Sequence, residues 1–200
     1  MFKWRHIMGI MIKKTEDMDF IGDNDLLRKI LIELQWDTNS GNKDIDLDIA
    51  AFCLGKGGKV HKDSDFVFYN NLKHPSGAVE HLGDNLLGDG KGEQIIVDLA
   101  YVPSDICNIT FAAAIYRAGV KNQKFGQGIS CYIRIVNANN NQELLKYDLS
   151  EKFSDETAVV IGELYKYIRT WKFGEINKGV KGGLAVLCEE FGVNYTQSND

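Results

Sequence analysis

Short stretches typical of β-strands recur along the first three quarters of this chain, joined by connections rich in glycine or asparagine. No helical segment separates them before residue 150. Because consecutive strands without a helical crossover pair antiparallel, the pattern predicts a two-sheet antiparallel β-sandwich. The expected strands cover residues 29–35, 45–54, 65–69, 94–99, 108–116, 130–137 and 144–149.

The pattern changes after Ser150, where apolar residues return at helical spacing. It predicts one helix over residues 154–167 and a second over residues 183–191, which Gly192 would end. Residues 171–173, between the two helices, are expected to form a short strand. The predicted fold class is therefore all-β dominated, a sandwich with two C-terminal helices packed on it.

The composition is that of a soluble globular protein, with 44% hydrophobic and 26% charged residues. Residues 1–25 are irregular in pattern, and we interpret them as an N-terminal extension of a domain that spans residues 26–196. The formal net charge of −5 argues against nucleic-acid binding, which needs a basic face. No apolar run approaches the roughly 18 residues of a membrane-spanning helix, so we expect no membrane insertion and a cytoplasmic location.

The cysteines and histidines show no arrangement typical of catalysis. Cys53, Cys107, Cys131 and Cys188 form no C-x-x-C pair, and the first and third lie in apolar runs. Buried free thiols in a reducing compartment are the expected state. The four histidines form no H-E-x-x-H pair, and no nucleophile motif accompanies them. We therefore expect that the protein is not an enzyme.

Acidic residues concentrate between positions 44 and 93, beginning with Asp44, Asp46 and Asp48. An EF-hand loop is excluded, because its sixth position would be Ile49 instead of glycine and its twelfth Gly55 instead of glutamate. A strand fits the spacing better, with Asp46 and Asp48 on one face and the alternating aliphatic residues on the other. That face could bind a cation, or it could simply be solvated.

Two further segments supply oxygen atoms suited to a hard cation such as Ca²⁺. Asn70 and Asn71 end one expected strand, where they could either ligate an ion or form a turn. The segment 83–93 contains four glycines together with Asp84, Asn85, Asp89 and Glu93. It is either an ion-binding loop or a mobile hairpin loop. Its spacing and acidity do not fit a phosphate-binding loop.

These segments together resemble the TerD-type family of tellurium-resistance and general stress proteins. The resemblance covers roughly residues 28–195, in order and without large gaps. The stretches that carry it include WDTNSGNKDIDLDIAAFCL, GKVHKDSDFVFYNN, SGAVEHLGDN with the glycine run after it, VDLAYVP and GGLAVLCEEFGV. The family is known for a two-sheet β-sandwich that binds Ca²⁺ through acidic positions.

The resemblance implies a set of Ca²⁺ ligands in this chain. They are Asp46, Asp48, Asn70, Asn71, Asp84, Asn85 and Glu93, with the backbone carbonyls of Gly88 and Gly90. The chain departs from the family pattern at Leu86 and Leu87, where polar residues are usual, and at its N-terminus, which lacks the usual opening strand. The number of bound ions is therefore left open.

The resemblance implies a Ca²⁺-dependent interaction module in a cytoplasmic stress response, with other stress or tellurium-resistance proteins as partners. Two alternatives are a non-catalytic assembly domain with purely structural calcium and a small-ligand protein of the cyclic-nucleotide-binding type. No soft-ligand cluster for tellurium is evident among the scattered cysteines. Any tellurium resistance is therefore expected to be indirect.

Overall fold

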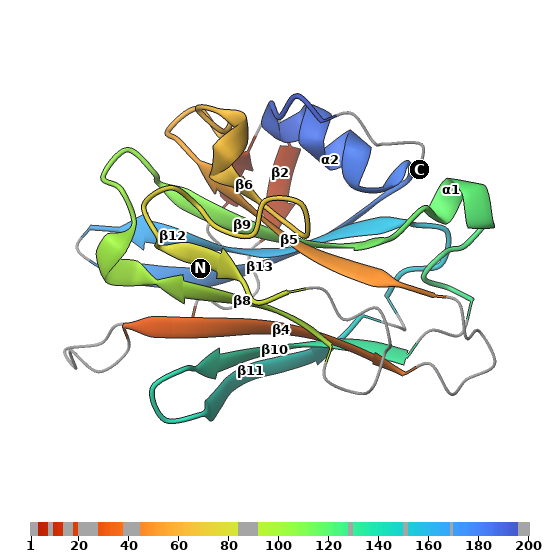
Figure 1. Ribbon diagram of the computed structural model, residues 1–200, viewed down its shortest axis with the longest axis horizontal. Coiled ribbons are helices and arrows are strands. Elements are labelled where there is room, and N and C mark those ends of the chain that lie inside the picture. Colours follow the sequence, from red (N-terminus) through yellow and green to blue (C-terminus); the bar gives the residue numbers. More distant parts are fainter. Residues whose placement is uncertain are drawn as a thin grey trace.

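Two antiparallel β-sheets face each other in the computed structural model of this chain (Figure 1). The structure describes residues 4–7, 10–13, 18–19, 28–37, 45–83, 92–127, 130–149, 152–168 and 170–195. Within these residues one sheet has five strands and the other six, and β1 and β2 form a separate two-stranded hairpin. The predicted two-sheet antiparallel sandwich is confirmed.

The five-stranded sheet has the order β11-β10-β4-β8-β7. Strand β4 lies at its centre, paired on one side with β10 and on the other with β8. The strands are β4 (Lys29–Asp37), β7 (Val79–His81), β8 (Glu93–Asp98), β10 (Ser130–Asn137) and β11 (Gln142–Asp148).

The six-stranded sheet has the order β3-β13-β12-β9-β5-β6. Its strands are β3 (Met18–Asp19), β5 (Leu47–Leu54), β6 (Phe66–Val67), β9 (Asn108–Ile115), β12 (Ala158–Tyr167) and β13 (Thr170–Val180). The hairpin of β1 (Trp4–Ile7) and β2 (Ile10–Lys13) and strand β3 fall within the expected N-terminal extension. The expected domain boundary at residue 26 stays a prediction.

Side-chain alternation along β5 divides the apolar residues into two layers. Leu47 and Ile49 are fully buried in the main core between the two sheets. Ala50 and Phe52 point to the opposite face, where they pack in a second cluster with helix α2 (Gly183–Phe191). The six-stranded sheet is thus buried on both faces, and Figure 1 shows α2 lying across its outer face.

Helix α2 covers this face because its apolar residues share one stripe. Leu187 is fully buried, and the ring of Phe191 lies 4.6 Å from the ring of Phe52, between centroids. The helix ends at Gly192, whose φ of 79° is a left-handed conformation that favours glycine. This predicted helix is confirmed. No helix in the described part of the chain is long and apolar enough to cross a membrane.

The predicted helix over residues 154–167 is wrong, because Ala158–Tyr167 forms strand β12. This strand lies between β9 and β13, and both of its faces are covered. A strand covered on both faces shows continuous apolar residues without alternation, and a short apolar run of this kind also fits helical spacing. In the described part of the chain, a second α-helix is the single turn α1 (Ala118–Lys121), which precedes β10 and which the sequence did not predict.

Several boundaries also differ from the expectation. Strand β13 spans eleven residues, where the sequence predicted only residues 171–173. The expected strand over residues 65–69 is short, since Asp63–Asp65 forms a 3₁₀ turn and only Phe66–Val67 is extended. Strand β7, at one edge of the five-stranded sheet, was not predicted.

Candidate functional site

A buried pair of titratable side chains closes the base of the β7–β8 hairpin. His81 ends β7 and Glu93 begins β8, and both side chains are fully buried. His81 Nε2 lies 3.5 Å from Glu93 Oε2, and the same oxygen accepts a hydrogen bond of 2.6 Å from the backbone N–H of Ile49. The Glu93 carboxylate therefore connects the hairpin to β5 of the other sheet.

The residue before Glu93 explains why the chain re-enters the sheet at this point. Gly92 has a φ of 61°, and a Cβ added there would lie 2.0 Å from the carbonyl oxygen of Leu34. No side chain fits so close to the backbone of β4, so the position requires glycine. This contact fixes where β8 begins and hence where the Glu93 carboxylate lies.

The structure places Glu93 and Asp48, two of the predicted ligands, on opposite faces of β5. Glu93 contacts the backbone of β5 at Ile49 from the side of the main core, whereas the side chain of Asp48 lies on the outer face of β5, as do those of Ala50 and Phe52. Asp48 is buried, with 5% of its surface exposed, and Asp46 is half-buried. Four predicted ligands lie outside the described residues: Asp84, Asn85, Gly88 and Gly90.

The two predicted asparagines lie in the turn that follows β6. Asn71 Nδ2 donates a hydrogen bond of 2.6 Å to the carbonyl oxygen of Phe66, and the backbone groups of Asn71 and Phe68 bond to each other. The Asn71 side-chain nitrogen therefore stabilises the turn, the alternative role left open by the sequence. Asn70 is exposed at the tip of this turn.

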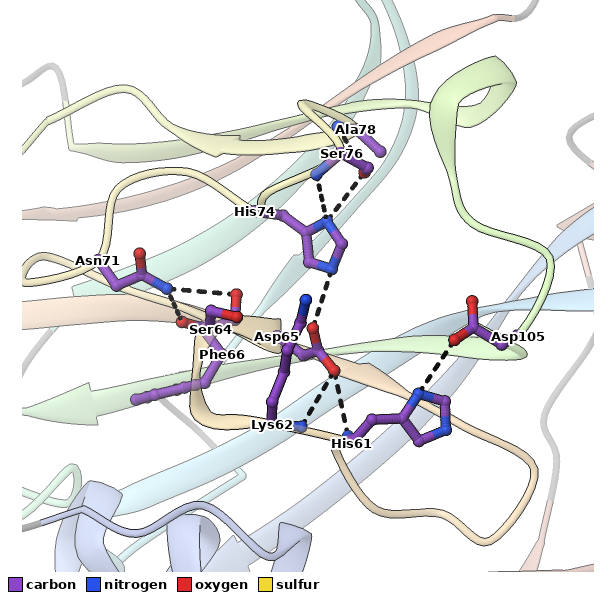
Figure 2. A network of polar contacts seen from close by, with 10 residues as sticks. All are labelled: His61, Lys62, Ser64, Asp65, Phe66, Asn71, His74, Ser76, Ala78 and Asp105. Carbon is purple, nitrogen blue, oxygen red and sulfur yellow. Dashed lines mark hydrogen bonds and ion pairs between the residues drawn. The ribbon is translucent and has the colours of Figure 1, made fainter.

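Figure 2 shows a second polar network, which sequence reasoning missed. Buried Asp65 accepts hydrogen bonds from the backbone N–H groups of His61 and Lys62, at 3.1 and 3.3 Å, and its Oδ1 lies 3.3 Å from His74 Nε2. The other ring nitrogen, His74 Nδ1, lies 2.8 Å from the Ser76 hydroxyl. Nine sequence positions separate Asp65 from His74, and the sequence carries no pattern that pairs them.

This network resembles a Ser-His-Asp relay in its order of contacts, but its hydrogen bonds fit a structural role. The Ser76 hydroxyl accepts from the backbone N–H of Ala78, and the Ser76 N–H donates to His74 Nδ1. Both contacts hold the loop between β6 and β7 in shape. Burial lowers the pKa of His74, while the nearby Asp65 carboxylate opposes that effect.

Glu93 contacts the Ile49 backbone N–H and His81 Nε2, neither of which is an oxygen ligand. The predicted ligands are carboxylate, amide and backbone oxygens, which suit Ca²⁺. Among the described residues no three His, Cys, Asp or Glu side chains form a metal-binding group. The Ca²⁺ site implied by the resemblance therefore stays a prediction, of which the described residues include Glu93 but not the segment from 84 to 91.

The two facing antiparallel sheets make this chain a β-sandwich protein. A family model described as the TerD domain matches residues 8–191. The chain belongs to the TerD domain family, as the sequence resemblance predicted.

Relatives in this family are named for stress and tellurium resistance. The chain is 56% identical over 137 residues to the chemical-damaging agent resistance protein B of Clostridium acetobutylicum, across 68% of this chain and 99% of the relative. It is 43% identical to general stress protein 16U of Bacillus subtilis, across 93% and 98% of the two chains. It is 40% identical to the tellurium resistance protein TerD of Serratia marcescens, across 94% and 99%.

A solved structure supports the fold. A homologue of the telluride resistance protein TerD from Streptomyces coelicolor superimposes with a TM-score of 0.66, over 80% of this chain and 95% of that one. The two sequences are 19% identical, so the similarity concerns the fold alone.

Proposed function

We propose that this chain is a Ca²⁺-binding protein of a tellurium-resistance or general stress response, and that it acts as a Ca²⁺-dependent interaction module. The observation that carries the proposal is the fully buried Glu93 carboxylate at the base of the β7–β8 hairpin, which follows the acidic, glycine-rich segment 83–92 in the sequence. The names of its relatives support the stress role.

Binding of Ca²⁺ would act first on the hairpin loop. The chain places Asp84, Asp89 and Glu93 within ten residues, and ionised carboxylates so close in sequence repel one another unless a cation lies between them. A bound ion would neutralise this repulsion and order the loop, which would then present a surface to a partner protein. We expect the partner to be another stress or tellurium-resistance protein.

Titration calorimetry of the purified chain with Ca²⁺ and Mg²⁺ tests the site. We expect Ca²⁺ to bind with a dissociation constant of about 10⁻⁷ to 10⁻⁵ M and Mg²⁺ more weakly. Glu93→Gln and Asp84→Ala should each weaken Ca²⁺ binding at least tenfold. Glu80→Gln is the matched control, since Glu80 is on the same hairpin but is only partly buried and is paired with Lys73. Absence of Ca²⁺ heat, or unchanged binding in Glu93→Gln, would falsify the site.

Partner capture with and without a chelator tests the regulatory part of the proposal. We expect stress-response proteins to be retained by the Ca²⁺-loaded chain and lost in the presence of chelator. If Ca²⁺ raises the melting temperature but partner capture does not change, the ion is structural and the interaction module does not depend on it.

A further inference from the structure

A pocket of about 170 Å³ opens on the outer face of the six-stranded sheet. It lies at the end of the sheet where β9 and β13 end and β5 and β12 begin. The first turn of α2 and the short helix α1 form its walls. Both helices lie on the upper side of the six-stranded sheet in Figure 1. The function proposed above makes no use of this pocket.

Three tyrosines and one carboxylate dominate the polar lining. Tyr69 and Tyr195 share a hydrogen bond between their hydroxyl oxygens, at 3.3 Å. The ring of Tyr116 meets the ring of Tyr69 edge to face, with centroids 5.9 Å apart. The carboxylate is that of Asp48, of which only 5% is exposed. These four side chains come from four distant segments of the chain, and we refer to them as the tyrosine pocket.

The charge in the tyrosine pocket is negative. Among the described residues that line it, none is a lysine, arginine or histidine. The Asp48 carboxylate is buried in this lining, where water screens its interaction with a nearby cation only weakly.

The backbone donors of the pocket do not favour an anion. The N–H groups of Gly182 and Gly183, at the start of α2, both donate to the Thr157 hydroxyl, at 3.0 and 2.8 Å. That contact already satisfies the two donors that an anion would otherwise approach. The face of an aromatic ring, by contrast, attracts organic cations, as does a buried carboxylate.

We propose that the tyrosine pocket binds a small organic ammonium ion, whose charge faces Asp48 and whose alkyl groups contact the tyrosine rings. The size is appropriate, because a cavity of roughly 150 Å³ accommodates a molecule as large as benzene. A quaternary or methylated amine of similar size meets both the charge and the apolar surface of the lining.

NMR titration of the full chain with tetramethylammonium chloride tests the proposal. We expect saturable shifts of the tyrosine ring signals with a millimolar or tighter dissociation constant. Tert-butanol has the same number of heavy atoms but no charge, and it should bind at least tenfold more weakly. Sodium chloride at equal ionic strength should cause no such shifts. Equal binding of tert-butanol, or no saturable binding of tetramethylammonium, would overturn the proposal.

Two variants locate the site. Asp48→Asn removes the charge and should weaken tetramethylammonium binding at least tenfold. Gly119→Leu should block the pocket without steric strain, since a Cβ added at Gly119 meets no atom within 4 Å. The Gly119→Leu variant tests the location of the binding site even if Asp48→Asn does not fold. Unchanged binding in a folded Gly119→Leu variant would place the ligand elsewhere.

A cross-comparison separates this proposal from the Ca²⁺ site, because the family resemblance also gives Asp48 as a Ca²⁺ ligand. Glu93→Gln should weaken Ca²⁺ binding and leave tetramethylammonium binding unchanged, whereas Gly119→Leu should do the reverse. If Ca²⁺ displaces tetramethylammonium competitively from the wild-type chain, Asp48 belongs to the ion site and the separate ammonium site is contradicted.

Discussion

Asp65 and His74 join two parts of the molecule that pair with different sheets. Asp65 lies directly before β6, at the edge of the six-stranded sheet, and His74 lies before β7, at the edge of the five-stranded sheet. Their side chains are 3% and 5% exposed, so the 3.3 Å contact between them is shielded from water. A buried polar group without its partner costs about 1–3 kcal/mol, which makes this pair a local determinant of stability.

The lowered pKa of His74 predicts how stability depends on pH. The unfolded chain takes up a proton near pH 6.5, but the folded chain does so only at lower pH because burial disfavours the charged ring. The contribution of His74 is therefore complete above about pH 6.5 and is lost as the pH falls through the folded value. We expect urea unfolding to show lower stability at about pH 5.5 than at pH 7.5, with a smaller difference in His74→Gln.

The comparison between the two proteins isolates His74 from other titrating groups. His74→Gln keeps a polar side chain but cannot gain a charge. If the wild type and this variant lose equal stability between the two pH values, His74 does not cause the loss.

At the scale of elements, α2 completes the outer layer of the six-stranded sheet. Its buried residues pack against Ala50 and Phe52 of β5 and against the alanines of β9. The small side chains of β9 allow the helix to approach closely, and the Thr157 hydroxyl accepts hydrogen bonds at its first turn. The position of α2 therefore depends on contacts with β5, with β9 and with Thr157, which directly precedes β12.

Leu187→Ala should destabilise the protein by about 2–5 kcal/mol, because the residue is fully buried and its truncation would leave a cavity between α2 and the six-stranded sheet. Val186→Ala is the matched control on the same helix, because the residue is 38% exposed, and it should change stability by less than about 1 kcal/mol. Chemical denaturation measures both. Similar losses in the two variants would mean that α2 does not pack on the sheet as described.

At the scale of the whole molecule, the burial of the cysteines shows which layers exclude solvent. All four are free; Cys53 and Cys131 lie in the main core, and Cys188 lies under α2. Burial raises the pKa of the Cys188 thiol to about 12, so it is protonated at neutral pH. Cys107 alone is partly exposed. The expected buried free thiols are confirmed for three of the four.

Thiol labelling with a disulfide reagent should therefore detect one fast-reacting cysteine per native chain and four in urea. The three buried thiols should react only as fast as the protein opens, because a thiol must be exposed and ionised to attack the reagent. A second fast thiol lost in Cys188→Ser would show that α2 opens separately from the sandwich.

The sequence alone predicted the fold class and most strands, because alternation and turn residues are local properties. In β5 the alternation also predicted the two faces, with Leu47 and Ile49 opposite Asp48. It failed at β12, since a strand whose two faces are both covered by apolar layers has no alternation to distinguish it from a helix. Burial on both faces is a property of the assembled layers.

The candidate Ca²⁺ site, the Asp65–His74 network and the tyrosine pocket also depend partly on local sequence and partly on the tertiary structure. Residue types and the family resemblance are enough to indicate the acidic positions, Glu93 among them. Only the tertiary structure placed the Glu93 carboxylate against the Ile49 N–H and joined Asp65 to His74. It also gathered Tyr69, Tyr116 and Tyr195 around Asp48. Each of these contacts joins segments that are distant in the sequence. Which side chains meet depends on the order of the strands in each sheet and on their register. Strand order and register are set by pairing between distant segments, which local sequence patterns do not show.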